Sequence, residues 1–79
     1  MITSIKMNNT LAVNIWFSPD KLFVLLSDER EIAVPLKWFP SLQKATEHER
    51  NNWRLIGNGQ GIHWEELDED ISIAGLLKN

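Results

Sequence analysis

Cysteine is absent from this 79-residue chain, and its absence excludes several kinds of chemistry. The chain can form no disulfide bond, no thiolate metal site and no cysteine nucleophile. No stretch of apolar residues approaches the roughly 20 that a membrane-spanning helix needs. Residues 1–6 also lack the apolar region of a secretory signal. We therefore expect a cytoplasmic protein that does not enter a membrane.

Clustered positive charge is also missing. The chain has eight Lys and Arg residues against eleven Asp and Glu, a formal net charge of −3, and no two basic residues are adjacent. Nucleic-acid binders usually present a basic stripe, because phosphate contacts dominate their affinity. We therefore expect no direct binding of nucleic acid. The acids do cluster within residues 65–70, and their negative field would attract a basic partner.

The length of the chain predicts a single domain over residues 1–79. A domain this short buries only about 60–65% of the surface that its unfolded chain exposes, so its core must be rich in large apolar groups. Four Trp and three Phe supply them, in a chain that is 43% hydrophobic. We expect Trp38, Trp53 and Trp64 to lie in this core.

Alternating polarity in the first half predicts an antiparallel β-meander. In residues 11–17, one face carries Leu11, Val13, Ile15 and Phe17, and the other carries Ala12, Asn14 and Trp16. Trp16 is therefore either exposed or covered by another chain. Residues 22–26 are apolar on both faces; a core helix is the alternative, but their length favours a strand. Residues 31–35 form the third predicted strand, and residues 2–7 are a further candidate. Turns at residues 18–21 and 27–30 are short enough to make neighbouring strands antiparallel.

Short helices and a glycine-rich loop are predicted for the second half. Pro40 suits the first turn of a helix over residues 40–45. Thr46 and Glu49 form a capping-box pattern that predicts a second helix over residues 47–53, although one continuous helix is the alternative. Residues 57–61 would join residues 54–56 and 62–64 as a hairpin, and residues 71–77 would end the chain as a strand or helical turn. The fold class is therefore α+β, with a meander of three to four strands followed by short helices.

Two motifs in the second half have a chemical interpretation, and both have a simpler structural one. The three glycines of residues 57–61 could wrap an anion, but their spacing is not that of a dinucleotide-binding loop. His63 lies near Glu66, Asp68 and Asp70, a combination that can bind a metal or transfer protons. No second histidine is well placed, because His48 belongs to a predicted solvent-facing helix. We therefore interpret the loop as a turn and His63 as a structural residue, and predict no enzyme activity, catalytic residue, metal or cofactor.

We also predict a candidate interaction surface. It includes Trp64, although we favour a core position for this residue. The surface comprises Trp16, Arg54, His63, Trp64, Glu65, Glu66, Asp68, Glu69 and Asp70.

Many residues from residue 34 onward match the pattern of a known family. They are Val34, Pro35, Leu36, Trp38, Phe39, Pro40, Leu42, Ala45, Thr46, Glu49, Arg50, Asn52, Trp53, Leu55, Ile56, Gly57, Gly59, Gly61, Ile62, His63, Trp64, Leu67, Asp68, Glu69, Asp70, Ile71, Ser72, Gly75, Leu76 and Leu77. This pattern resembles the bacterial domain-of-unknown-function family numbered 2442 (DUF2442). The resemblance implies a compact α+β domain, alone or joined to a helix-turn-helix module. It also implies a small partner protein from a neighbouring gene, in a pair that looks like a toxin–antitoxin module, but no established activity.

Two positions depart from that family pattern. Members often have Asp-Gly where this chain has Asp28-Glu29, and a glutamate resists the positive φ of a type I′ turn, so we expect another turn type. Members also often have proline where this chain has Glu47, which supports a helix start at that point.

The sequence thus leads us to expect a protein-interaction module, the antitoxin-like member of a two-protein pair. One alternative is a DNA-associated regulator that acts with a partner, and another is a small metal- or ligand-binding protein centred on His63. An open edge of the meander would also allow a homodimer.

Overall fold

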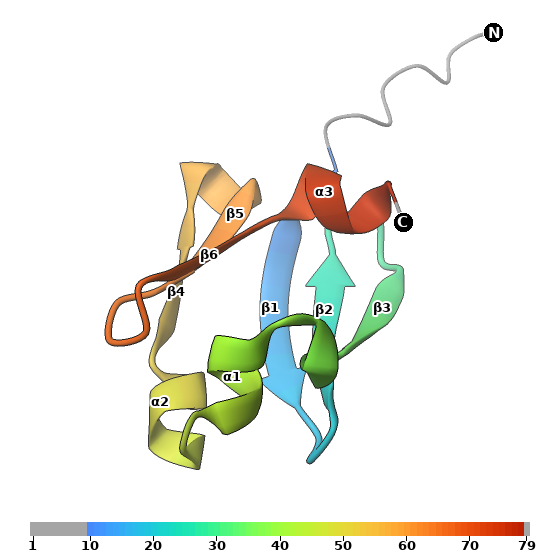
Figure 1. Cartoon of the computed structure of the whole chain (residues 1–79). Coiled ribbons are helices and arrows are strands. Elements are labelled where there is room, and N and C mark those ends of the chain that lie inside the picture. The colour runs from blue at the N-terminus through green and yellow to red at the C-terminus, as the bar shows by residue number, and fades with distance from the viewer. Residues whose placement is uncertain (1–9, 79) are drawn as a thin grey trace, which may run out of the picture.

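The computed structural model describes residues 10–78, which form two three-stranded antiparallel sheets with short helices between and after them (Figure 1). The candidate strand over residues 2–7 lies outside the described residues. The elements are β1 (Ala12–Phe17), β2 (Lys21–Leu26), β3 (Glu31–Pro35), the 3-10 turn η2 (Leu36–Trp38), α1 (Pro40–Lys44), α2 (Glu47–Asn51), β4 (Trp53–Ile56), the 3-10 turn η3 (Gly57–Gly59), β5 (Gly61–Trp64), β6 (Glu69–Ser72) and α3 (Ile73–Leu77). The α+β class and the meander are confirmed.

The first sheet has the strand order β1-β2-β3, as the alternating pattern predicted. One detail of that prediction is wrong, because a β-bulge interrupts the register between Ala12 and Asn14. An extra residue in a strand reverses the faces beyond it. Ala12 therefore shares the buried face with Ile15, and Val13, which we placed on the same face as Ile15, is 53% exposed.

The turn between β2 and β3 is not of type I′, but the reason for that expectation is wrong, because Glu29 itself adopts the positive φ that glutamate was expected to resist. A type I′ turn needs positive φ at both central residues. Here Glu29, with φ +77°, is the residue of this turn that takes a left-handed conformation. The Leu26 N–H donates to the Arg30 carbonyl at 2.8 Å, and the Glu29 N–H donates to the Leu26 carbonyl at 2.9 Å. These bonds close a three-residue loop whose last position favours glycine.

The helices α1 and α2 are separate, so the alternative of one continuous helix is wrong. Ala45 and Thr46, between them, both have extended backbone, with ψ values of 156° and 166°. The Thr46 side chain accepts the Glu49 N–H, and the Glu49 side chain accepts the Thr46 N–H, which is the predicted capping box. The helix α2 ends at Asn51, two residues before the predicted end.

The second sheet has the strand order β4-β5-β6. Its first two strands are the predicted hairpin, joined by η3. The chain then turns through residues 65–68 into β6 and continues directly into α3, so the C-terminal segment forms both a strand and a helical turn. The Ser72 side chain accepts the Gly75 N–H and begins α3.

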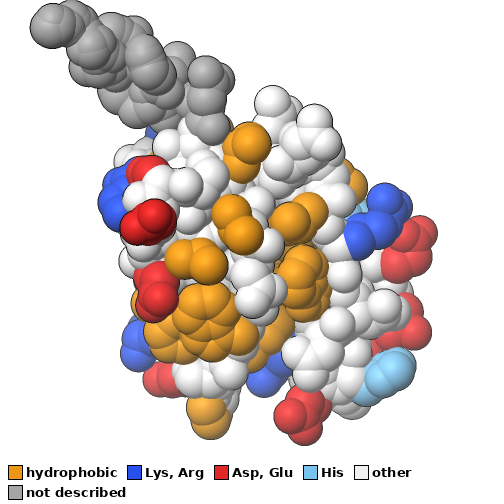
Figure 2. Space-filling view, turned by 180° about the vertical axis from the view of Figure 1, so that it is seen from behind, with side chains coloured by type: hydrophobic (Ala, Val, Ile, Leu, Met, Phe, Trp, Pro, Cys, Tyr) orange, Lys and Arg blue, Asp and Glu red, His pale blue; other side chains and the backbone are white. Residues whose placement is uncertain are grey.

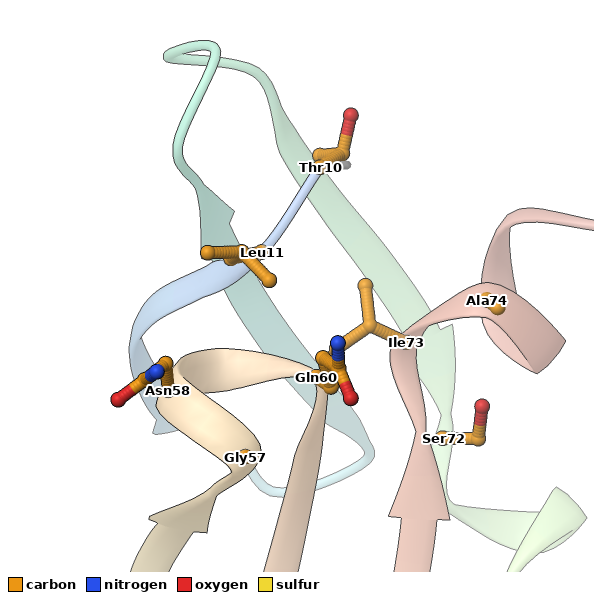
Figure 3. A pocket seen from close by; sticks show the side chains of 8 residues that line it. All are labelled: Thr10, Leu11, Gly57, Asn58, Gln60, Ser72, Ile73 and Ala74. Carbon is orange, nitrogen blue, oxygen red and sulfur yellow. The ribbon is translucent and has the colours of Figure 1, made fainter. Parts of the chain in front are cut away.

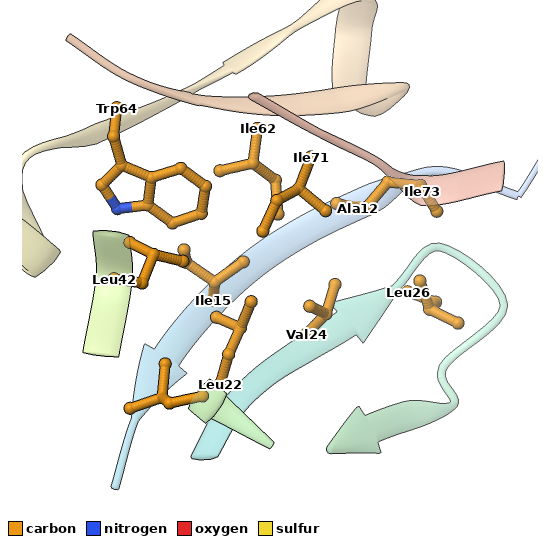
Figure 4. Packing of buried hydrophobic residues seen from close by; sticks show 11 residues of the cluster. Ala12, Ile15, Leu22, Val24, Leu26, Leu42, Ile62, Trp64, Ile71 and Ile73 are labelled. Carbon is orange, nitrogen blue, oxygen red and sulfur yellow. The ribbon is translucent and has the colours of Figure 1, made fainter. Parts of the chain in front are cut away.

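Both sheets contribute to one hydrophobic core, which Figure 4 shows from close by. Its fully buried members include Leu22 and Val24 of β2 and Ile62 and Trp64 of β5. The ring of Phe17 packs edge-on against Trp64, with centroids 6.5 Å apart. Further members are Ala12, Ile15, Leu26, Leu36, Leu42, Ile71 and Ile73.

One expectation about the core is wrong. Trp38 is 53% exposed, because it ends η2 at the surface while Leu36 of the same turn occupies the interior. Among residues 10–78, no helix has the length and apolar character that crossing a membrane requires.

Candidate functional site

The outward face of the second sheet carries a row of charged side chains from three strands. Arg54 of β4 lies opposite His63 of β5, and His63 lies opposite Asp70 of β6. Residues directly opposite each other on one face of an antiparallel sheet have neighbouring side chains. The structure thus brings together three residues of the candidate surface that lie far apart in the sequence.

His63 is held by carboxylates on both sides of its ring. Its Nδ1 lies 2.5 Å from Asp70 Oδ1, and its Nε2 lies 3.2 Å from Glu65 Oε1. The Arg54 guanidinium donates to the same Glu65 oxygen at 3.2 Å. The ring therefore lies between two carboxylates of the same chain, with Asp70 bonded to Nδ1 and the exposed Glu65 close to Nε2.

This geometry agrees with the interpretation of His63 as a hydrogen-bonded structural residue. The set that we considered as a metal site joined His63 to Glu66, Asp68 and Asp70. Within residues 10–78, no group of three or more His, Cys, Asp or Glu side chains is placed to hold a metal ion. The network instead ties β4, β5 and β6 together on their solvent face.

The acidic cluster is less uniform than its sequence suggests. Glu65 and Asp70 belong to the His63 network, and Glu69 accepts a hydrogen bond from the Ser41 hydroxyl of α1. Glu66 and Asp68 lie exposed in the turn between β5 and β6. These two carboxylates are the members of the cluster most open to a basic partner.

Trp64 does not belong to any surface, which corrects its place in the candidate set. Its side chain is fully buried, and its Nε1 donates to the Arg50 carbonyl at 2.9 Å. An indole buried with its N–H satisfied is a core residue that also fixes the position of α2. Alternation in β5 places Trp64 inward and His63 outward.

The glycine-rich loop borders a hollow of about 400 Å³, shown in Figure 3. Its walls are formed by Thr10, Leu11, Gly57, Asn58, Gln60, Ser72, Ile73 and Ala74. None of these lining residues from the described part of the chain is basic, so they offer an anion no opposite charge. The glycines instead allow the left-handed backbone of the turn, because Gly57 and Gly59 have φ values of +59° and +105°.

The outer face of the first sheet presents a second kind of surface. Trp16 of β1 stacks on Phe23 of β2 with parallel rings whose centroids lie 5.8 Å apart. Trp16 is 38% exposed, Val13 is 53% exposed, and Phe23 and Leu25 are half-buried on the same side. Figure 2 shows apolar side chains gathered on this side of the molecule, with acidic and basic side chains around them. We call Val13, Trp16, Phe23 and Leu25 the apolar face.

Sequence reasoning identified Trp16 as a surface candidate and missed the other three residues. The sequence did indicate Phe23 and Leu25, because residues 22–26 are apolar on both faces of the strand. Such a strand either is covered by other elements on both faces or leaves one apolar face exposed. The exposure of Val13 could not be predicted from alternation, because the β-bulge shifts the faces of β1 at this point.

Comparison with known proteins gives a fold and a family, and no activity. The profile of the family described as "Protein of unknown function (DUF2442)" matches residues 12–79. No curated protein matches the chain.

Two solved structures share this fold. The first is the crystal structure of a protein of unknown function from Rhodospirillum rubrum. It has a TM-score of 0.77 and 27% identity, with 90% of this chain and 88% of that chain covered. The second is the solution NMR structure of an uncharacterized protein from Chromobacterium violaceum. It has a TM-score of 0.76 and 20% identity, with 94% of this chain and 70% of that chain covered.

The family profile covers both sheets and all three helices of the structure, including the charged network and the apolar face. The chain therefore belongs to the DUF2442 family, whose function is unknown.

Proposed function

We propose that this protein is a protein-interaction module, the antitoxin-like member of a pair whose other member is a small basic protein encoded by a neighbouring gene. The observation that carries the proposal is the apolar face, on which two stacked aromatic rings remain partly exposed. Contiguous exposed apolar surface on a small protein is characteristic of a binding site.

The composition of the apolar face suits an interface. Trp is among the residues that contribute most to binding energy when a partner buries them, and aromatic side chains are enriched at interfaces. The stack with Phe23 fixes the Trp16 ring before binding, so that less conformational entropy is lost in the complex. Lys21 of β2 and Glu31 of β3, which pairs with Leu25, are exposed and supply a polar rim.

Charge supports a basic partner. The chain has a formal net charge of −3, and Glu66 and Asp68 are exposed. A toxin that acts on RNA needs basic residues to bind phosphates, and an acidic protein that covers those residues would block it. The DUF2442 resemblance adds the expectation of a neighbouring gene for such a partner.

Co-expression with the product of the adjacent gene tests this proposal. We expect the two proteins to purify as one complex, and we expect this chain to relieve any toxicity of its partner. Trp16→Ala and Phe23→Ala should each weaken the complex at least tenfold, whereas Leu77→Ala, whose residue is 36% exposed in α3, should leave it unchanged.

Two results would contradict the proposal in different ways. Absence of both a complex and any relief of toxicity would refute the interaction function with this partner. A complex that Leu77→Ala weakens as much as Trp16→Ala would show that the apolar face is not its binding surface.

A further inference from the structure

The free side of β6 is an open strand edge. β6 is the last strand of the second sheet, and its other side pairs with β5. In an antiparallel pair, alternate residues direct their N–H and C=O groups towards the neighbouring strand. The Ile73 N–H donates to the Gln60 carbonyl at 2.9 Å, which fixes this alternation. Ile71 therefore faces β5, while Asp70 and Ser72 direct their backbone groups away from it.

Three backbone groups are available at this edge. They are the N–H and C=O of Asp70 and the N–H of Ser72, since the Ser72 carbonyl lies at the start of α3. Within residues 10–78 no other strand pairs with this edge, and these three groups make no backbone hydrogen bond to a loop or turn. An open edge of this kind is a template for an additional strand.

Hollows on either side of β6 match the side chains that such a strand would carry. One has a volume of about 300 Å³ and lies between β6 and the surfaces of η2 and α3. The other has a volume of about 330 Å³ and lies between β6 and the loop that joins β4 to β5. Both include Asp70, Ile71 and Ser72 in their walls. Because side chains alternate along a strand, neighbouring residues of an added strand would point to opposite sides.

The two hollows differ in chemistry. The first is walled by Trp38, Phe39 and Leu76, so it would take an apolar side chain. Asp70 is the ionisable residue in the walls of both, and its carboxylate is 68% exposed beside His63. A basic side chain on the outward side of the added strand would therefore meet an opposite charge.

We propose that an extended segment of a partner protein, with alternating apolar and basic side chains, adds to β6 as a fourth strand of the second sheet. This inference depends on the proposed interaction function in one respect, which is that the added segment belongs to a partner protein. The backbone of the segment bonds to Asp70 and Ser72, its apolar side chains enter the hollow beside Trp38, and its basic side chains face Asp70. This is recognition by strand addition, in which backbone bonds give affinity and pockets give specificity.

Charge favours a partner segment over a second copy of this chain. Two copies that paired through β6 would bring Asp68, Glu69 and Asp70 of both chains to one shared edge. Like charges brought together across strands destabilise the pairing. A basic segment reverses the sign of that interaction.

A matched pair of substitutions at Ser72 isolates the edge N–H. Ser72→Ala and Ser72→Pro both remove the hydroxyl that accepts the Gly75 N–H, but only proline removes the backbone donor. The φ of Ser72 is −88°, near the value that proline requires. The probe is a capped hexapeptide in which lysine alternates with valine, titrated into the protein by NMR.

We expect the hexapeptide to shift the amide signals of Asp70 and Ser72 in the wild type. Ser72→Ala should bind within threefold of the wild type, and Ser72→Pro should bind at least tenfold more weakly. Trp38→Ala should also weaken binding at least tenfold, and it keeps the test valid if Ser72→Pro fails to fold. A hexapeptide in which glutamate alternates with valine should bind at least tenfold more weakly than the lysine peptide.

Several results would overturn the inference. These are equal affinities of Ser72→Ala and Ser72→Pro, amide shifts confined to residues outside β6, and no binding of the lysine peptide. Light scattering that shows a dimer abolished by Ser72→Pro and kept by Ser72→Ala would assign the edge to a second copy instead. Each result uses the isolated protein, so it is independent of whether the adjacent gene product forms a complex through the apolar face.

Discussion

Replacing Gly59 with alanine should destabilise this protein severely, although it adds only one methyl group. Gly59 is buried at the end of η3 and has φ +105°, a conformation that residues with a Cβ rarely adopt. A Cβ at this position would lie 2.5 Å from the Ala12 carbonyl oxygen and 3.2 Å from the Ala12 nitrogen. Both contacts are with backbone of β1, which cannot rotate away as a side chain could.

Two costs contribute to the expected change in the free energy of unfolding. Holding a non-glycine residue in this region costs about 1–3 kcal/mol. Forcing an added carbon into a packed site costs about a further 1–3 kcal/mol. The smaller entropy of the unfolded alanine chain offsets about 0.4–1 kcal/mol of this sum. We therefore expect a net loss of about 2–4 kcal/mol, which would lower the Tm of a domain this size by more than about 10 °C.

The same substitution at Gly75 is the matched control. Gly75 lies in α3, and a Cβ there would meet the Ser72 Cβ at 3.6 Å, which is ordinary contact. Alanine in a helix is favoured over glycine, so Gly75→Ala should be neutral or stabilise by up to about 1 kcal/mol.

Urea and thermal unfolding, followed by tryptophan fluorescence and circular dichroism, measure both variants. A Gly59→Ala protein within about 1 kcal/mol of the wild type would refute the argument, because it would mean that η3 and β1 separate at little cost. Equal losses at Gly59 and Gly75 would show that the left-handed backbone and the close approach to Ala12 are not the cause.

Three further predictions follow from particular residues. Glu29→Gly should raise the free energy of unfolding by about 0.5–1 kcal/mol, because Glu29 has φ +77° and glycine relieves this strain. Trp64→Phe should lower it by about 2–4 kcal/mol, since the smaller ring leaves a cavity and the Arg50 carbonyl loses its donor; urea unfolding measures both. The Arg30 backbone N–H, together with the Arg30 guanidinium, lowers the pKa of Asp28. The ionised Asp28 therefore stabilises the fold above its ordinary pKa, and this contribution is lost as the pH falls through the lower pKa of the folded state. Asp28→Asn should flatten the decline in stability below about pH 4, as thermal unfolding at a series of pH values would show.

Each of these predictions has a control and a contradicting outcome. Glu66→Gly, in an exposed turn, should not raise the free energy of unfolding. If it raised this free energy as much as Glu29→Gly does, relief of the positive φ at Glu29 could not be the cause. Trp38→Phe should cost less than about 0.5 kcal/mol because Trp38 is 53% exposed, and a larger loss than at Trp64 would contradict the described core. If the stability of Asp28→Asn declined below about pH 4 as steeply as that of the wild type, the Asp28 carboxylate would make no contribution to the stability of the fold.

The local elements of this fold could be predicted where neighbouring residues decide them. Alternating polarity placed β1 and β3, and the length of an apolar run between two turns placed β2, because both signals lie within a few residues. The Thr46 and Glu49 capping box separated α1 from α2, because both hydrogen bonds form within four residues. The same kind of local reasoning failed at Glu29, which takes φ +77° within the hydrogen-bonded loop.

The candidate site depended on contacts between distant parts of the chain. No local rule indicates that Arg54, His63 and Asp70 form one row, because the register of three strands brings them together. The bulge after Ala12 separated Val13 from Ile15, with which we grouped it, and placed it on the apolar face. Trp38 is apolar enough for the core and still lies at the surface, because η2 directs Leu36 inward.

The sequence by itself determined the three strands of the meander, the starts of α1 and α2 and the hairpin of β4 and β5, because these depend on interactions within a few residues. Only the tertiary structure decided that Trp38 is exposed, that His63 lies beside Asp70 and that, among residues 10–78, no strand pairs with the outer edge of β6. Those outcomes depend on which segments pack together, and packing is decided by the whole hydrophobic core and by no single stretch of the chain.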